Sequence, residues 1–192
     1  MSRREETLSP EYFDSMYKVA ADPWQFATSD YERQKYAATL ALLRPKSYSS
    51  VLEVGCSIGV FTAQLAPRCS SLLAIDASEL ALKSARQRVG DPHVVFEKRM
   101  VPAEFPKGQF DLIILSEVLY YLTASDLERT TMLCADALTA NGHVILCHWL
   151  GETDYPLDGS VASDLFAREI AKRLPRRRIV HDQIYRLEEF SL

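Results

Sequence analysis

Cysteine and histidine are scarce in this chain of 192 residues, which contains four of each. The cysteines form no CxxC pair, and the histidines show no metal-ligand spacing with them, so no metal site is expected. Reduced thiols inside the cell are the simplest interpretation. Because the first residues lack the apolar stretch of a secretory signal, we expect a cytoplasmic protein.

The chain also lacks an excess of positive charge and a long apolar run. Its 22 Lys and Arg residues face 26 Asp and Glu residues, which gives a net charge of −4. Such a chain has no broad electrostatic attraction to nucleic acid or to an anionic membrane. The one basic run, residues 176–178, is typical of a solvated helix end. We therefore expect a small-molecule substrate, no nucleic-acid or membrane partner, and a monomer or weak dimer.

Strand and helix patterns alternate from residue 50 onward. Because such alternation predicts a parallel sheet with helices on both faces, we expect a three-layer α/β fold. The predicted strands are the apolar runs 51–54, 72–76, 94–96, 111–115 and 144–147, the last of them entered through an Asn141-Gly142 turn. Two strand-like pieces, 178–184 and 185–190, predict a closing antiparallel hairpin with a turn near Asp182-Gln183. Predicted helices at 10–22 and 30–44 precede the sheet, so we divide a single domain into a helical lid, 1–47, and a core, 48–192.

A glycine loop lies directly between the first predicted strand and the next helix. It reads Glu53-Val-Gly55-Cys56-Ser57-Ile-Gly59. Gly55 allows a sharp turn, and Gly59 allows the helix backbone to approach a ligand closely. The helix N-terminus adds free N–H groups and a positive dipole end. By itself, the loop is equally consistent with a tight turn in any α/β protein.

Two acids at the ends of neighbouring predicted strands narrow the choice of ligand. Glu53 ends the first strand, where a carboxylate can hold the ammonium group of an amino-acid moiety. Asp76 ends the second strand, where it can accept both hydroxyls of a ribose, with a helix-capping role as the alternative. The two acids together predict a nucleoside that carries an amino-acid tail.

With these motifs the sequence resembles class I S-adenosylmethionine-dependent methyltransferases. Glu53–Gly59 is similar to their E/DxGxGxG loop, although Cys56-Ser57 replace one glycine position. Asp76 corresponds to their ribose acid, and Phe110–Leu115 and Leu138–Leu146 are similar to their fourth-strand and fifth-strand motifs. The resemblance implies a Rossmann-like sheet of seven mostly parallel strands with an antiparallel C-terminal strand. It also implies S-adenosylmethionine as the cofactor and methyltransferase activity.

A narrower resemblance, to the nodulation protein S (NodS) family, extends to both ends of the chain. It is carried by the glycine loop together with Asp22-Pro23-Trp24, Ser29, Glu32-Arg33-Gln34 and Ser116–Leu122. That family N-methylates the deacetylated amino sugar of a chitooligosaccharide, which implies an amine acceptor and a role in oligosaccharide biosynthesis. The resemblance places Trp24 and Arg33 in a cover over the cofactor, with Arg33 as a clamp for the cofactor carboxylate or as a solvated helix charge.

The adenine side of the cofactor departs from the family pattern. The family commonly has an acid after the third strand, whereas this chain has Arg99-Met100-Val101-Pro102, so Met100 or Val101 is expected to pack on the adenine. The complete predicted cofactor set is Trp24, Arg33, Glu53, Gly55, Cys56, Gly59, Asp76, Ala77, Met100, Val101 and Ser116.

The predicted catalytic residues, Glu117 and His148, follow the fourth and fifth strands, where open α/β sheets place their sites. Glu117 is expected to orient or deprotonate a substrate ammonium, with capping of the next helix as the alternative. His148 is expected to assist as a base, with a hydrogen-bonded structural histidine as the alternative. The predicted acceptor-pocket residues, for which plain packing is the main alternative, are Tyr120, Tyr121, Trp149 and Tyr155.

Two other functions remain open from the sequence. An NAD-dependent oxidoreductase shares Asp76 but needs GxGxxG, and this loop has Ser57 at the middle glycine position. A non-catalytic S-adenosylmethionine-binding module is compatible with every motif. A nucleic-acid methyltransferase is disfavoured, because the fourth strand ends in Ser-Glu-Val-Leu and not in an Asn/Asp-Pro-Pro-aromatic run.

Overall fold

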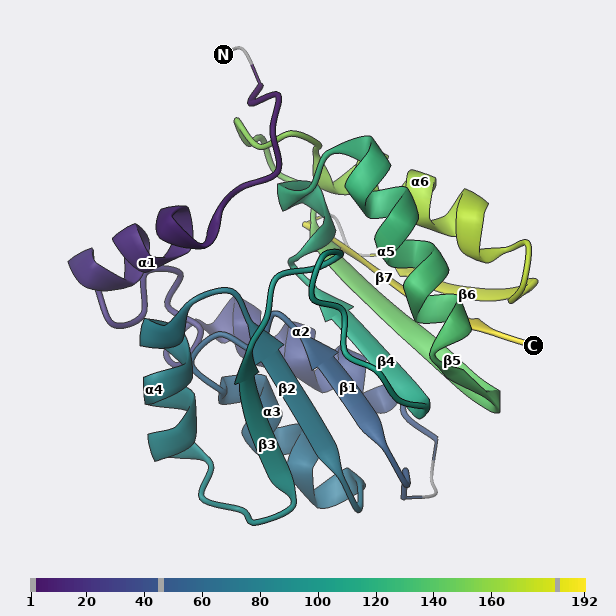
Figure 1. The fold of residues 1–192 in the computed structure, drawn as a ribbon, viewed down its shortest axis with the longest axis horizontal. Helices are drawn as coiled ribbons and strands as arrows, with labels where there is room; N and C mark the ends of the chain where they lie inside the picture. Colours follow the sequence, from purple (N-terminus) through teal and green to yellow (C-terminus); the bar gives the residue numbers. More distant parts are fainter. Residues whose placement is uncertain (1–2, 45–46, 182–183) are drawn as a thin grey trace. The chain divides into compact units, whose positions relative to one another are not determined.

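The computed structural model describes residues 3–44, 47–181 and 184–192. Within these residues the strands form a seven-stranded sheet in the order β3-β2-β1-β4-β5-β7-β6 (Figure 1). This confirms the predicted Rossmann-like α/β fold. By packing, the chain divides into two units, Ser9–Arg99 and residues 1–8 with 100–192, and each is described separately below.

The unit Ser9–Arg99 contains the three parallel strands β1, β2 and β3. Leu72 of β2 lies opposite Val51 of β1 and Val94 of β3. All four residues of β1 are buried, as expected for a strand inside a parallel sheet. The elements are α1 (Pro10–Val19), α2 (Asp30–Ala41), β1 (Val51–Val54), α3 (Val60–Leu65), η1 (Ala66–Arg68), β2 (Leu72–Asp76), α4 (Glu79–Arg88) and β3 (Val94–Lys98).

Helix α2 carries a buried ion pair that its sequence pattern did not indicate. The ammonium of Lys35 donates to Glu32 over 3.0 Å, and both side chains are buried. The Lys35 nitrogen lies 5.1 Å from the ring centroid of Tyr31 and 5.9 Å from that of Tyr36. Both distances are typical of cation–π contacts. The helix is also shorter than predicted, since it ends at Ala41.

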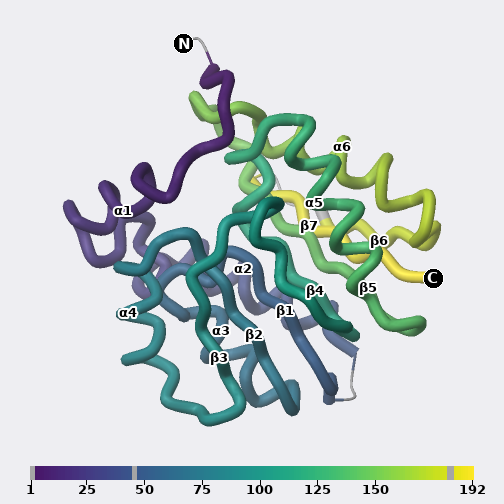
Figure 2. The backbone as a smooth tube through the Cα atoms, in the orientation of Figure 1, coloured from purple at the N-terminus to yellow at the C-terminus, as the bar shows by residue number. Residues whose placement is uncertain are grey.

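The other unit contains a parallel pair, β4 and β5, followed by two antiparallel strands. Strand β7 lies between β5 and β6 and is antiparallel to both. Helices α5 and α6 pack side by side against β5 (Figures 1 and 2). The elements are β4 (Phe110–Ser116), η2 (Leu119–Tyr121), α5 (Ala124–Asp136), β5 (Leu138–Trp149), α6 (Gly159–Ile170), β6 (Arg176–His181) and β7 (Tyr185–Ser191).

Two details of this unit correct the sequence predictions. The fifth strand begins at Leu138 and does not follow an Asn141-Gly142 turn. Gly142 instead lies at a shift of register beside β4, where a Cβ atom would stand 3.0 Å from the carbonyl oxygen of Phe110. The basic run 176–178 lies in strand β6 and not at a helix end.

The predicted closing hairpin is confirmed as β6 and β7, and its turn at Asp182-Gln183 lies outside the described residues. None of the helices in the described ranges is both long and apolar enough to span a membrane. Those ranges also contain no group of three or more His, Cys, Asp or Glu residues suited to a metal ion. The lid and core boundaries and the oligomeric state stay predictions.

Candidate active site

The glycine loop of the unit Ser9–Arg99 turns through three left-handed residues. Gly55 has φ +80°, Ser57 has φ +50° and Gly59 has φ +76°. Ser57 therefore keeps the backbone conformation of the glycine that it replaces, at a cost that glycine would not incur. At Gly59 a Cβ atom would stand 3.0 Å from the Cα of Ala85 in α4. The close packing of α3, which begins after Gly59, against α4 therefore requires glycine at this position. From the sequence, Gly59 was instead expected to allow the close approach of a ligand.

Asp76 links this loop to the beginning of α4. One carboxylate oxygen accepts the N–H of Ser57 and the other accepts the N–H of Ser78, each over 2.8 Å. Desolvation on burial raises the pKa of Asp76 to about 6, although these backbone hydrogen bonds oppose the shift. Because each oxygen has two lone pairs, the oriented carboxylate can still accept a pair of hydroxyls.

Glu53 is the least satisfied polar group of the loop. Its side chain is buried, and Oε2 has no hydrogen-bond partner among the residues that the structure describes. The pKa of Glu53 is raised to about 7, mainly by burial and to a smaller extent by the charge of Asp76, while the hydroxyl of Thr62 opposes the shift. A buried carboxylate oxygen without a donor is costly, and a bound cation would remove that cost. The site therefore fits a ligand with a positively charged group next to a diol.

Helix α1 contributes two residues to this site that were not expected from the sequence. The hydroxyl of Tyr17 lies 2.5 Å from the hydroxyl of Ser57. The hydroxyl of Ser78 donates to Asp14 over 2.5 Å. Asp14 and Tyr17 stand three residues apart and so share one face of α1, which lies beside α4 (Figure 1). That spacing was the available signal, but no motif marked it.

The remaining predicted cofactor residues have different environments. Trp24 packs on Tyr17 with ring centroids 5.6 Å apart. Cys56 is buried, which raises the pKa of its thiol. Arg33 is exposed and pairs with Asp30, as the solvated-charge alternative describes. Ala77 follows Asp76 and is half-buried. Met100, Val101 and Ser116 belong to the other unit. Within that unit Val101 is buried, and the backbone N–H of Met100 donates to Glu104 over 2.9 Å.

In the unit that contains β4 and β5, Glu117 joins the ends of these two strands. Its backbone is left-handed, with φ +57°, which is uncommon for a residue with a side chain and is often found at functional sites. Its Oε2 accepts the hydroxyl of Tyr120 over 2.7 Å and the backbone N–H of Trp149 over 2.9 Å. The carboxylate is thereby held in a fixed orientation.

His148 is fully buried, and both of its ring nitrogens are engaged. Nε2 accepts the backbone N–H of Leu119 over 3.1 Å. Nδ1 lies 3.2 Å from the hydroxyl of Ser163, which itself donates to the carbonyl of Gly159. Nδ1 must therefore carry the proton and donate it to Ser163. This arrangement matches the structural alternative for His148, because an imidazole base needs a free nitrogen that reaches the substrate.

Three of the predicted pocket residues form one aromatic cluster. The rings of Tyr120, Tyr121 and Tyr155 lie 4.6 to 5.4 Å apart. Burial raises the pKa of Tyr120 and of Tyr121, so their hydroxyls stay protonated at neutral pH. The fourth, Trp149, has a side chain that covers Gly151, where a Cβ atom would stand 2.0 Å from Cζ2.

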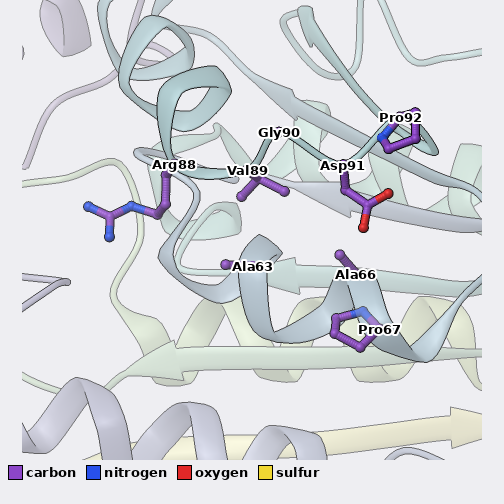
Figure 3. Close-up of a pocket in the computed structure, with 8 residues that line it drawn as sticks. All are labelled: Ala63, Ala66, Pro67, Arg88, Val89, Gly90, Asp91 and Pro92. Carbon is purple, nitrogen blue, oxygen red and sulfur yellow. The ribbon is translucent and has the colours of Figure 1, made fainter.

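A pocket of the unit Ser9–Arg99 lies between the C-terminal part of α3 with η1 and the turn that follows α4 (Figure 3). Arg88 extends away from it and donates to the carbonyl of Ile58 over 2.9 Å, while Asp91 pairs with His93. Because these charged groups are already engaged, the pocket offers little chemistry. Its lining residues are Ala63, Ala66, Pro67, Arg88, Val89, Gly90, Asp91 and Pro92.

Comparison with known proteins gives one family. The family model "Nodulation protein S (NodS)" matches residues 15–147. Nodulation protein S of Bradyrhizobium diazoefficiens is 41% identical over 53% of this chain and 49% of its own length. The protein of the same name from Rhizobium tropici is 35% identical over 66% of this chain and 55% of its own length. The chain thus spans about half the length of these curated relatives.

Solved structures agree with this assignment. The N-methyltransferase NodS from Bradyrhizobium japonicum WM9, crystallised with S-adenosyl-L-homocysteine, superposes with a TM-score of 0.81 at 23% identity, over 96% of this chain and 98% of that one. A candidate methyltransferase from Pseudomonas syringae gives a TM-score of 0.72 at 37% identity, over 84% of this chain and 99% of that one. The superposition on the NodS structure, at 23% identity, shows a shared fold. The match to the family model covers more than half of the chain. The chain therefore belongs to the nodulation protein S family.

Proposed function

We propose that this protein is an S-adenosylmethionine-dependent methyltransferase that N-methylates an amine on a small molecule. The observation that carries the proposal is the buried carboxylate of Glu53, whose Oε2 has no hydrogen-bond partner among the described residues. Asp76, held by two backbone N–H groups, ends the neighbouring strand. A ribose next to an amino-acid ammonium suits this pair better than a nicotinamide dinucleotide does. Family membership supports the same conclusion.

Each residue of the loop has a defined role in this proposal. Glu53 binds the ammonium group of the cofactor, and Asp76 accepts the ribose hydroxyls. Tyr17 and Asp14 hold helix α1 against the loop through Ser57 and Ser78. When bound, the cofactor supplies a methyl group that is electrophilic because it is attached to a sulfonium.

Glu117 is the catalytic residue of the proposal. An amine is mostly protonated at neutral pH, and methyl transfer needs its lone pair. The carboxylate of Glu117 orients the ammonium group and accepts its proton, a role in which general bases typically contribute 10²- to 10⁴-fold. His148 is a positioning residue, since it fixes Leu119 and thereby the short helix that carries Tyr120.

The amine that we propose is that of a deacetylated amino sugar in a chitooligosaccharide. Supporting evidence comes from the relatives, which are named for nodulation, and from the related N-methyltransferase NodS structure. In the aromatic cluster, the partly exposed rings of Tyr121 and Tyr155 are suited to pack on a sugar ring and to contact an ammonium, whereas Tyr120 is buried beneath them.

Cofactor choice is tested by calorimetry with S-adenosyl-L-homocysteine and with NAD. We expect binding of the first and little affinity for the second. The Asp76→Ala variant should bind S-adenosyl-L-homocysteine about 1–3 kcal/mol more weakly, because the ribose hydroxyls lose a charged acceptor. Tighter binding of NAD would contradict the proposal and favour an oxidoreductase.

The acceptor is tested by incubation with S-adenosylmethionine and a chitin tetramer whose terminal sugar is deacetylated. Mass spectrometry should show the addition of a methyl group, and the fully acetylated tetramer serves as the control. Cofactor binding without methylation of this tetramer or of a panel of amines would indicate a binding module.

A further inference from the structure

Residues 3–8, called the N-terminal strap below, begin beside residues 153–158, called the insert (Figure 1). The guanidinium of Arg3 donates to the carbonyl of Tyr155 over 3.2 Å and to the carboxylate of Asp158 over 3.1 Å. The backbone N–H of Arg4 donates to the carbonyl of Asp154 over 3.0 Å, and its side chain pairs with the Asp154 carboxylate. The strap thus holds the insert through both backbone and side-chain groups.

The other end of the strap is fixed to the last residue of η2 and to the turn that follows it. Leu8 is buried, and its N–H donates to the carbonyl of Tyr121 over 2.9 Å. The hydroxyl of Thr7 donates to Asp126 over 2.5 Å and accepts the N–H of Thr123 over 2.9 Å. Because its anchors lie far apart in the sequence, the strap connects two segments that no local pattern relates.

The two segments that the strap connects carry two of the three clustered tyrosines. Tyr121 and Tyr155 have ring centroids 4.7 Å apart, and the strap donates hydrogen bonds to the backbone carbonyls of these same two residues. The insert has one further backbone bond to the cluster, from the N–H of Leu157 to the carbonyl of Tyr120 over 3.2 Å. The strap and this bond together hold the insert beside the aromatic cluster.

We propose that Arg3, Arg4 and Thr7 are positioning residues for the acceptor. By holding the insert against the turn, they fix the edge-to-face pair of Tyr121 and Tyr155, which forms the wall against which the sugar ring of the acceptor amine packs. The inference rests on the proposed function, because it assigns the cluster to the acceptor. Both arginine ion pairs are partly exposed to solvent, so each is weak and is screened by salt. Acceptor affinity should therefore fall as ionic strength rises.

The test uses the full chain and the Arg3→Ala/Arg4→Ala variant, with Arg178→Ala as a control that removes an exposed arginine from β6. We expect the KM for the deacetylated chitin tetramer to rise about five- to tenfold and to lose its salt dependence. The kcat should change less than about twofold, and S-adenosyl-L-homocysteine should bind as in the wild type. Thr7→Val should act in the same direction, and the control should match the wild type.

Two further measurements separate positioning from a fold defect. The charge-reversed pair Arg4→Asp/Asp154→Arg should recover a low KM, whereas Arg4→Asp alone should not. Hydrogen exchange of the amides in the insert should accelerate about tenfold in the double alanine variant, with the strands unchanged.

Each outcome decides the question. Unchanged exchange in the insert, or accelerated exchange with an unchanged KM, overturns the positioning role. A wild-type protein that binds S-adenosyl-L-homocysteine but methylates no amine refutes the proposed function, and the acceptor role of the strap with it. A wild-type enzyme with variants that share its KM refutes the strap alone.

Discussion

At the scale of single residues, Glu117 and His148 were both predicted to be catalytic, but the structure holds them in different ways. Glu117 accepts two hydrogen bonds on one oxygen, whereas both ring nitrogens of His148 are engaged. We expect Glu117→Gln to lower kcat on the order of 10²-fold with nearly unchanged cofactor affinity, since the amide cannot accept the proton. Steady-state kinetics and calorimetry give both values, and a wild-type rate across pH 6–9 would mean that solvent removes the proton.

His148→Asn should behave differently from Glu117→Gln. We expect the free energy of unfolding to fall by about 1–3 kcal/mol, because the buried N–H of Leu119 or the buried hydroxyl of Ser163 loses its hydrogen-bond partner. Urea unfolding measures this change. A shifted pH optimum with unchanged stability would instead restore the role of a base to His148.

Glu53 should make cofactor affinity depend on pH. Its pKa is raised to about 7, so the carboxylate that binds the ammonium becomes mostly ionised only above neutral pH. We therefore expect the affinity for S-adenosyl-L-homocysteine to rise between pH 6 and pH 8. The Glu53→Gln variant should bind about 10- to 100-fold more weakly at pH 8 and lose most of this dependence. Calorimetry at several pH values tests this, and equal affinity in the variant would exclude Glu53 as the ammonium acceptor.

At the scale of elements, helix α1 is held to the glycine loop by the hydrogen bond between Tyr17 and Ser57. We expect Tyr17→Phe to weaken cofactor binding by about 0.5–1.5 kcal/mol, while the ring keeps its contact with Trp24. Ser57→Gly removes the same hydrogen bond but relieves the left-handed strain of that residue.

A double-mutant cycle measures the interaction within this pair. Because both variants remove one shared hydrogen bond, the combined variant should lose less affinity than the sum of the single losses. Additive losses would show that Tyr17 acts through other contacts. Helix α1 follows the strap directly along the chain, so a change in the strap could also move α1. The strap residues are therefore kept unchanged in this cycle.

At the scale of the whole molecule, Glu53 should lower the stability of the ligand-free protein above neutral pH. Its folded pKa of about 7 exceeds the ordinary value of 4.5, so the folded protein binds the proton more tightly than the unfolded chain does. The contribution of this group to stability is therefore complete below about pH 4.5 and is lost as the pH rises through about 7. Glu53→Gln should raise the free energy of unfolding at pH 8 by about 1–3 kcal/mol and change it little at pH 4.5.

Calorimetric unfolding at both pH values, without cofactor, tests this prediction. Asp76→Asn is a matched comparison, since its pKa is raised only to about 6 and two backbone N–H groups would lose a charged acceptor. A stability gain for Asp76→Asn equal to that for Glu53→Gln would contradict the assignment of the effect to the unsatisfied carboxylate.

Local patterns in the sequence determined the sheet and the cofactor acids. Buried parallel strands are continuous apolar runs, so β1 and β2 were visible. Asp76 was found because it ends such a run, and Glu53 because it is the one acid within such a run, next to last in β1. The start of β5 was predicted wrongly, because Asn141-Gly142 has the local signature of a turn. In the structure Gly142 instead allows the backbone of β5 to lie close to β4.

Only the tertiary structure decided which groups hold these residues in place. The contact of Tyr17 with Ser57 spans 40 residues, and that of Arg4 with Asp154 spans 150. The hydrogen bonds that join His148 to Leu119 and to Ser163 likewise fix its role without leaving any periodic signal. Periodicity records which side of an element is buried, because burial recurs with each turn or each second residue. A single polar contact between distant segments occurs once and has no period, so it is known only after the chain has folded.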